Sequence, residues 1–163
     1  MPPPQGFTLA EVLITLGIIG VVAALTIPTL IQNHKKTVIE TRLKKAYSVI
    51  NQAVNLSISN DTWIDPPLDK RYDDKVLNEW LQTSLFPYLN NVKLFSPNQI
   101  NHPLNTISSR YGVILSDGTT ITFHNNVQIH TYIDINGTKG PNRYGSDVFT
   151  FFLDYKNSRG RGY

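Results

Sequence analysis

One uninterrupted apolar segment near the N-terminus constrains this chain more than any other feature. It runs from Phe7 to Ile31 and reads FTLAEVLITLGIIGVVAALTIPTLI, with Glu11 as its one charged residue. A helix of this length spans about 37 Å, which exceeds a bilayer core of roughly 30 Å. The segment therefore predicts a membrane-spanning helix.

Two common uses of such a segment do not fit. A secretory signal peptide has a basic stretch before its apolar run and a small-residue cleavage site after it. Here MPPPQG precedes the run and QNHKK follows it, so both parts are missing. A plain single-pass anchor leaves Glu11 unexplained. Burial of a carboxylate in lipid is energetically costly, so a charged residue inside a membrane helix usually has a function. The segment needs another explanation.

The stretch Gly6–Glu11 reads GFTLAE. It resembles the cleavage and methylation motif of the type IV pilin and type II secretion pseudopilin superfamily. In that family, prepilin peptidase cuts after the glycine and methylates the new amino group of the phenylalanine, and the glutamate is needed for assembly. The resemblance implies cleavage after Gly6, methylation at Phe7 and an assembly role for Glu11. Pro28 matches a proline late in the family's apolar run.

The motif has a coherent physical basis. Cleavage leaves the apolar helix on the product and creates an ammonium group on Phe7, one turn before Glu11. Pairing of Glu11 with the Phe7 ammonium of a neighbouring subunit offsets the desolvation of both charges, whereas a subunit out of register buries one charge alone. The leader carries no Lys or Arg, so orientation rests on the motif, and a longer leader upstream stays open.

Softening of the helix is expected at Pro28, which lacks a backbone donor and favours a bend or local melting. Gly17 and Gly20 either weaken the helix in the same way or allow neighbouring helices to pack closely. Beyond the membrane, apolar residues recur every three or four positions and predict one long helix from about residue 8 to about residue 57. These residues are Ile39, Leu43, Ala46, Ile50 and Val54.

The rest of the chain predicts an antiparallel sheet of three or four strands. Asp117-Gly118 between Tyr111–Leu115 and Thr119–Phe123 is a hairpin signal. Residues 127–135 alternate apolar and polar, Asn125-Asn126 make the preceding turn, and Val148–Leu153 reads as a last strand. The predicted fold class is α+β and pilin-like, with a long N-terminal helix packed on a β-meander head. The expected divisions are a leader at 1–6, a transmembrane or filament-core part at 7–31, and an extracytoplasmic head at 32–163.

Several other predictions concern the head. Residues 59–73 form a loop, because Asp65-Pro66-Pro67 cannot continue a helix, and a short amphipathic helix then ends before Pro87. Trp63 and Trp80 are either core residues, which is favoured, or contacts for other subunits. Tyr47 is expected in the core rather than in a groove.

The most unusual stretch of the head lies between Asp134 and Asp147 and is rich in Asn and Gly. Its side-chain oxygens suit calcium, and some pseudopilins hold calcium in a C-terminal loop, so Asp134, Asn136, Thr138 and Asp147 are candidate ligands. Turn chemistry explains the same residue types, with both carboxylates bound to the loop's own backbone amides, and is favoured.

No other part of the sequence suggests a cofactor or catalysis. Cysteine is absent, the four histidines show no metal-ligand spacing, and there is no phosphate loop or nucleophile motif. The net charge of +3 does not predict nucleic-acid binding. The basic residues Lys35, Lys36, Arg42, Lys44 and Lys45 are expected on a solvated helix face, and Arg159 and Arg161 on a solvated tail.

The resulting hypothesis is a structural subunit rather than an enzyme. The resemblance implies prepilin peptidase, an inner-membrane assembly platform, other pilins or pseudopilins and copies of itself as partners. It also implies a location in the bacterial inner membrane and then in a periplasmic or cell-surface filament. The alternatives are a membrane-tethered ligand- or calcium-binding module that does not polymerise, and a minor pilin that binds DNA or surfaces.

Overall fold

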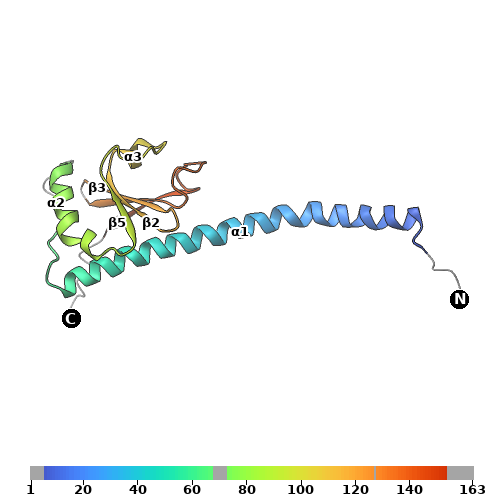
Figure 1. The fold of residues 1–163 in the computed structure, drawn as a ribbon, viewed down its shortest axis with the longest axis horizontal. Helices are drawn as coiled ribbons and strands as arrows, with labels where there is room; N and C mark the ends of the chain where they lie inside the picture. The colour runs from blue at the N-terminus through green and yellow to red at the C-terminus, as the bar shows by residue number, and fades with distance from the viewer. Residues whose placement is uncertain (1–5, 68–72, 127, 154–163) are drawn as a thin grey trace. The chain divides into compact units, whose positions relative to one another are not determined.

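The computed structural model describes residues 6–67, 73–126 and 128–153 (Figure 1). The chain divides into two compact units between Glu40 and Thr41. Helix α1 (Leu9–Ser59) contributes its first part to one unit and its second part to the other. The long helix predicted for residues 8 to 57 is thereby confirmed.

The N-terminal unit is helical from Leu9 onward, and Pro28 lies inside α1 without interrupting it. Of the two outcomes predicted at Pro28, local melting is wrong, and a bend stays a prediction. Proline removes one backbone donor, and the hydrogen bonds of the flanking turns are enough to keep the segment helical. Gly17 and Gly20 both have open space around them, with no atom within 4 Å of an added Cβ.

The C-terminal unit contains a single five-stranded antiparallel sheet in the order β1-β2-β3-β4-β5, a simple meander. Its strands are β1 (Val92–Phe95), β2 (Tyr111–Leu115), β3 (Thr120–Asn125), β4 (Ile129–Asp134) and β5 (Val148–Leu153). The predicted α+β arrangement is confirmed, but the predicted count of three or four strands is too low. Strand β1 was missed because four residues are too few to show a period.

The turn between β2 and β3 forms as the Asp-Gly signal predicts. Gly118 has a φ of 83°, a conformation that side chains disfavour. The Asp117 carboxylate accepts a hydrogen bond from the Thr119 amide at 3.0 Å, which fixes the turn. Asn125, predicted as a turn residue, instead ends β3, and Val127 lies outside the described residues.

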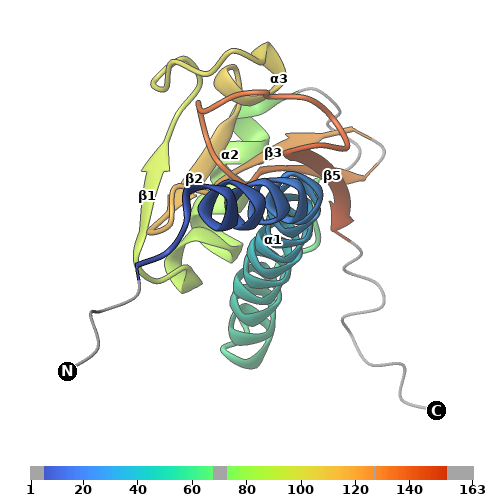
Figure 2. The same ribbon diagram turned by 90° about the vertical axis from the view of Figure 1, so that its right-hand side faces the viewer.

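The core lies between the sheet and residues 41–59 of α1. Val113, Ile121 and Ile133 are neighbours across β2, β3 and β4, and each is at most 1% exposed. Figures 1 and 2 show α1 and the short helix α3 (Asn105–Ser108) on opposite sides of the sheet. From α1, the head buries Ala46, Ile50, Ala53, Val54 and Ser57.

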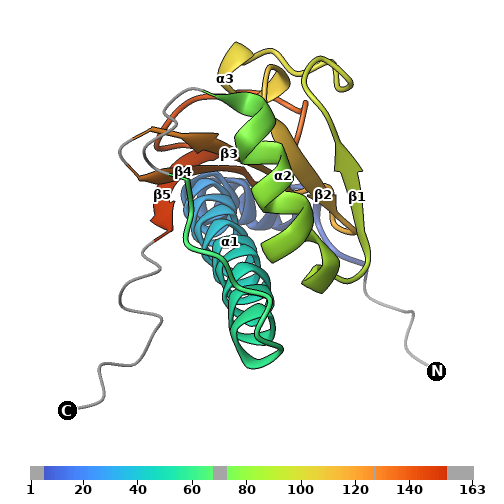
Figure 3. The ribbon, with the colours of Figure 1, turned by 90° about the vertical axis from the view of Figure 1, so that its left-hand side faces the viewer.

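Helix α2 (Asp74–Ser84) begins at the N-cap Asp73, whose side chain accepts hydrogen bonds from the amides of Lys75 and Val76. The 3₁₀ turn η1 (Phe86–Tyr88) follows, and Phe86 contacts Phe123 of β3. Figure 3 shows α2 beside α1. The short helix predicted before Pro87 is thus confirmed.

The aromatic predictions have mixed outcomes. Trp80 is buried as predicted, and Trp63 is half-buried and packs edge-on against it with ring centroids 5.5 Å apart. The prediction that Tyr47 belongs to the core is wrong, because its side chain is 62% exposed. Tyr47 follows Ala46 by one residue, about 100° around the helix, and so falls outside the buried stripe.

Candidate functional site

The start of α1 is organised by reciprocal hydrogen bonds between Thr8 and Glu11. The Thr8 amide and the Thr8 hydroxyl each donate to Glu11 Oε2 at 2.8 Å. In return, the Glu11 amide donates to Thr8 Oγ1 at 3.3 Å. This is a capping box, a T-x-x-E pattern that satisfies free donors at a helix N-terminus. Thr8 and Glu11 have this spacing in the sequence, so the capping box could have been predicted from it.

The other predicted residues of this region lie on either side of the capping box. Phe7 directly precedes Thr8 and is 90% exposed, and Gly6 is also exposed with open space around it. The carboxylate of Glu11 and the backbone of Phe7 are therefore close in sequence and accessible together. Pro28 is distant from both, so the structure does not bring it to this site.

The first part of α1 carries a long apolar stretch. Large side chains from Phe7 to Ile31 are exposed by 41% or more, and this helix is long and apolar enough to cross a membrane. Exposed apolar patches of this size mark a membrane or protein interface. Residues 7–31 are therefore available for burial in a lipid bilayer or against other helices.

Two basic residues of α1 bind the loops at one end of the sheet. Arg42 Nη1 donates to the Ile135 carbonyl, just after β4. Lys45 Nζ lies 2.8 Å from Asp117 Oδ2, in the β2–β3 turn. Burial alone raises the pKa of Asp117, but the hydrogen bonds from Lys45 and Thr119 outweigh it and lower that pKa.

These contacts correct part of the prediction of a solvated basic face. Lys35, Lys36 and Lys44 are exposed as predicted. Arg42 and Lys45 instead bind loop residues of the head. The periodicity of the sequence places these residues on the polar side of α1 but does not reveal which loops they reach. Arg159 and Arg161 lie outside the described residues.

Three of the four predicted calcium ligands come together. Asn136 donates its amide N–H to Asp134 Oδ1 at 2.9 Å and its side-chain amide to Asp147 Oδ2 at 3.3 Å. Asp147 also accepts the backbone amides of Asn142 at 2.7 Å and Arg143 at 2.6 Å. Thr138 is exposed and lies outside these hydrogen bonds.

Asp134 has a second partner that the sequence did not reveal. His102 Nε2 lies 2.9 Å from Asp134 Oδ2, and both side chains are fully buried. The Leu104 amide donates to His102 Nδ1, so neutral His102 carries its proton on Nε2 and donates to Asp134. Burial raises the pKa of Asp134, which the hydrogen bonds from Asn136 and His102 oppose.

All four oxygens of the two carboxylates therefore accept N–H donors from the protein. This is the arrangement expected of turn residues that bind their own backbone. A calcium ion at this loop would have to displace those donors to reach the carboxylate oxygens. Among the described residues, no three His, Asp or Glu side chains are grouped as metal ligands. A calcium site stays a prediction.

Two family models match different parts of the chain. A family model described as a family of unknown function (DUF6613) matches residues 29–160. The model of the prokaryotic N-terminal methylation motif matches residues 1–27. No curated protein and no solved structure matches the chain.

The match to the methylation motif confirms the resemblance to type IV pilins and pseudopilins and indicates a pilin-like precursor. The other match covers most of the chain, including the whole sheet. The protein therefore belongs to the DUF6613 family of unknown function, and its N-terminal segment is a pilin-type methylation motif.

Proposed function

We propose that this protein is a structural subunit of a type IV pilus or a type II secretion pseudopilus. One observation carries the proposal: the methylation motif at residues 1–27 contains the start of an apolar helix whose large side chains from Phe7 to Ile31 are exposed. A subunit with such a helix is incomplete alone. Membrane lipid covers the helix before assembly, and neighbouring helices cover it in a filament.

The proposed maturation begins with cleavage after Gly6 by prepilin peptidase and methylation of Phe7. The Thr8 amide survives this cleavage, so the hydrogen bonds to Glu11 also survive. They hold the carboxylate at the start of the helix, one turn from the new ammonium group. On assembly, Glu11 pairs with the Phe7 ammonium of a neighbouring copy, which offsets the desolvation of both charges.

The proposed partners are copies of this chain, other pilins or pseudopilins, prepilin peptidase and an inner-membrane assembly platform. The head then lies outside the cytoplasm, first at the inner membrane and later in a periplasmic or cell-surface filament. Its role is structural rather than catalytic. The contacts of Arg42 and Lys45 support this role, because they join the head to the helix that enters the filament.

Substitution of Glu11 tests the assembly step. Tagged Glu11→Ala chains, expressed with wild-type chains, are expected to be processed normally but to enter filaments at least about tenfold less often, because a buried ammonium without its partner is strongly unfavourable. The measurement is the ratio of tagged to untagged chains in sheared filaments. Glu40→Ala is the matched control, since Glu40 is an exposed carboxylate of the same helix beyond the apolar run.

Incorporation of Glu11→Ala in proportion to its expression would contradict the pairing mechanism. Complete absence of filaments from wild-type cells, with processed protein in the membrane, would favour a tethered module that does not polymerise.

A further inference from the structure

The sheet of the head ends in strands β1 and β5, each of which pairs with a neighbouring strand on one side only. Figures 2 and 3 show these two strands at opposite sides of the head. An edge strand carries backbone N–H and C=O groups that can pair with a strand of another chain. The register of the sheet identifies the residues that carry these groups.

On β5, the backbone groups that face away from β4 belong to Val148, Thr150 and Phe152. The Ile135 amide donates to the Asp147 carbonyl at 3.0 Å, and this pair continues the β4–β5 register. Hydrogen-bonded and non-hydrogen-bonded pairs alternate along an antiparallel ladder, so every second residue of β5 directs its groups outward. Both outward groups of Val148 bond the loop before β5. Among the described residues, none binds the outward groups of Thr150 and Phe152.

On β1, the same alternation identifies Val92 and Leu94. The Leu115 amide donates to the Thr119 carbonyl at 2.9 Å, which directs alternate residues of β2 to β3 and the others to β1. Across the β1–β2 register, the backbone groups of Val92 and Leu94 therefore face the outer edge. Within the part of the chain that the structure describes, these groups also have no backbone partner.

The two edges are protected to different degrees. Natural edge strands are blunted by short length, lysine, proline or a bulge. Strand β1 has four residues and carries Lys93, whereas β5 has six residues and reads VFTFFL, without charge, proline or glycine. The side chains of Thr150, Phe151 and Phe152 are all exposed. The edge of β5 is thus suited to pairing with another strand.

Strand β1 of a second copy matches this edge in direction. Four successive antiparallel pairs connect β1 to β5, so the two edge strands run the same way. A parallel pair between β5 and β1 of the next copy therefore keeps both heads in one direction. Subunits that enter a filament from one membrane need this common direction.

One register also brings exposed apolar side chains of the two edges together. Leu94 is 43% exposed and lies opposite Val113. Phe151 is 38% exposed and lies opposite Thr131. Val113 and Thr131 are buried on the same face of the sheet, so Leu94 and Phe151 share that face. With Phe151 beside Leu94, the outward groups of Thr150 meet those of the two β1 residues in a parallel ladder.

We propose that β5 pairs in parallel with β1 of a second copy of this chain, with Phe151 beside Leu94, so that the sheets of successive heads join. This inference rests on the proposed function, since it names a contact between heads within the filament. The two edges differ, so the contact is heterologous, and a heterologous contact that does not close into a ring propagates as an open helical filament. Backbone hydrogen bonds supply the affinity, and the two apolar side chains set the register.

Disulfide formation tests the contact directly, because the natural chain has no cysteine. Neighbouring strands lie about 4.8 Å apart, within the Cα separation that a disulfide requires. Full-length Phe151→Cys/Leu94→Cys chains, assembled into filaments and mildly oxidised, are expected to give a ladder of covalent multimers that a reducing agent removes.

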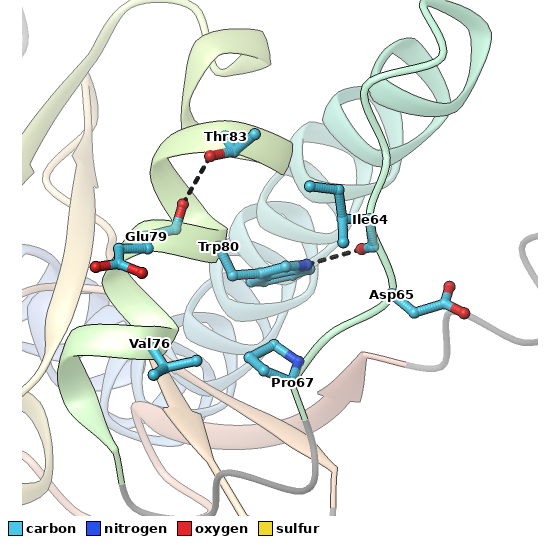
Figure 4. Close-up of a pocket in the computed structure, with 7 residues that line it drawn as sticks. All are labelled: Ile64, Asp65, Pro67, Val76, Glu79, Trp80 and Thr83. Carbon is cyan, nitrogen blue, oxygen red and sulfur yellow. Dashed lines mark hydrogen bonds between the residues drawn. The ribbon is translucent and has the colours of Figure 1, made fainter.

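Two control pairs separate this contact from random collision. Phe152→Cys/Leu94→Cys moves one cysteine to the opposite face of β5, and Thr83→Cys/Leu94→Cys moves it to an exposed position of α2 (Figure 4). The first control is expected to give a ladder at least about fivefold weaker, because successive side chains of a strand point to opposite faces. The second is expected to be as weak, because Thr83 lies outside the sheet. If the Phe151→Cys/Leu94→Cys ladder is no stronger than the control ladders in verified filaments, the inference is overturned and the proposed function stands. Absence of filaments from wild-type cells defeats both proposals.

Proline at position 150 gives an independent test without cross-linking. The Thr150 amide faces away from β4, so Thr150→Pro removes a donor from the outer edge and leaves the β4–β5 ladder intact. Relative to Thr150→Val, which keeps this amide, the proline variant is expected to enter filaments at least about fivefold less often, the effect of losing one backbone hydrogen bond. The two full-length variants are expected to melt alike in detergent. Equal incorporation of the two folded variants overturns the inference.

Discussion

Lys45 and Asp117 show how single charged residues join the long helix to the head. Their side chains are 42% and 23% exposed, so solvent screens the pair and its net contribution to stability is modest. The pKa of Asp117 is lowered even so, because Lys45 and the Thr119 amide both bind its ionised form. The effect of this pair should therefore be visible in the pH dependence of unfolding.

Asp117→Asn is expected to lower the free energy of unfolding by about 0.2–1 kcal/mol at neutral pH. A carboxyl whose pKa is lowered on folding stabilises the protein above its unfolded pKa, near 3.8, and loses that effect as the pH falls through its folded pKa. The difference between wild type and variant should thus shrink in acid. Urea unfolding of the full chain in detergent micelles between pH 7 and pH 3 measures it, and a difference that grows in acid contradicts the assignment.

The loop from Asp134 to Asp147 leads to a prediction about calcium. Its carboxylates are buried and already accept N–H donors, so we expect the melting temperature of the full chain in detergent to be the same in millimolar calcium and in chelator. An occupied site would add about 2.7 kcal/mol at a calcium concentration one hundred times its dissociation constant. A rise with calcium that Asp147→Asn abolishes would instead establish the site.

Among the elements, the pairing of β1, β2 and β3 is constrained by one glycine. Gly112 lies opposite Phe95 of β1 and Thr122 of β3. A Cβ at this position would lie 2.3 Å from the Ile121 carbonyl oxygen and 2.7 Å from the Phe95 ring. The Ile121 carbonyl belongs to the backbone of β3, so no side-chain rotation can relieve that clash.

Gly112→Ala is therefore expected to destabilise the head by about 1–3 kcal/mol through overpacking. Gly17→Ala adds the same methyl group in open space on α1 and is expected to leave the unfolding of the head unchanged. Thermal unfolding of the two full-length variants in detergent compares them. Equal melting temperatures for the two variants would show that the sheet can adjust at Gly112.

The elements also show what the sequence could predict. The long apolar run, the Asp-Gly turn and the alternation in β4 are local patterns, and each identified its helix, turn or strand. Strand β1 was missed because it is short and depends on pairing with β2. The pair His102–Asp134 was missed because 32 residues separate its members, and only the folded chain brings them together.

At the scale of the whole molecule, the two units differ in how their apolar residues are buried. The head has a complete core of its own, formed by the sheet, α2 and residues 41–59 of α1. The N-terminal unit leaves its apolar residues exposed and therefore needs a membrane or other subunits. The methylation motif lies in this unit, and the proposed cleavage after Gly6 would change the charge at the start of the helix. Both features support the proposed maturation before assembly.

Mass spectrometry of the mature N-terminus tests the central claim most directly. Protein isolated from the membrane of the producing cell is expected to begin at Phe7, with one methyl group on its amino nitrogen and the whole apolar helix retained. A chain that keeps residues before Phe7, or one cut after the apolar run, would contradict the account.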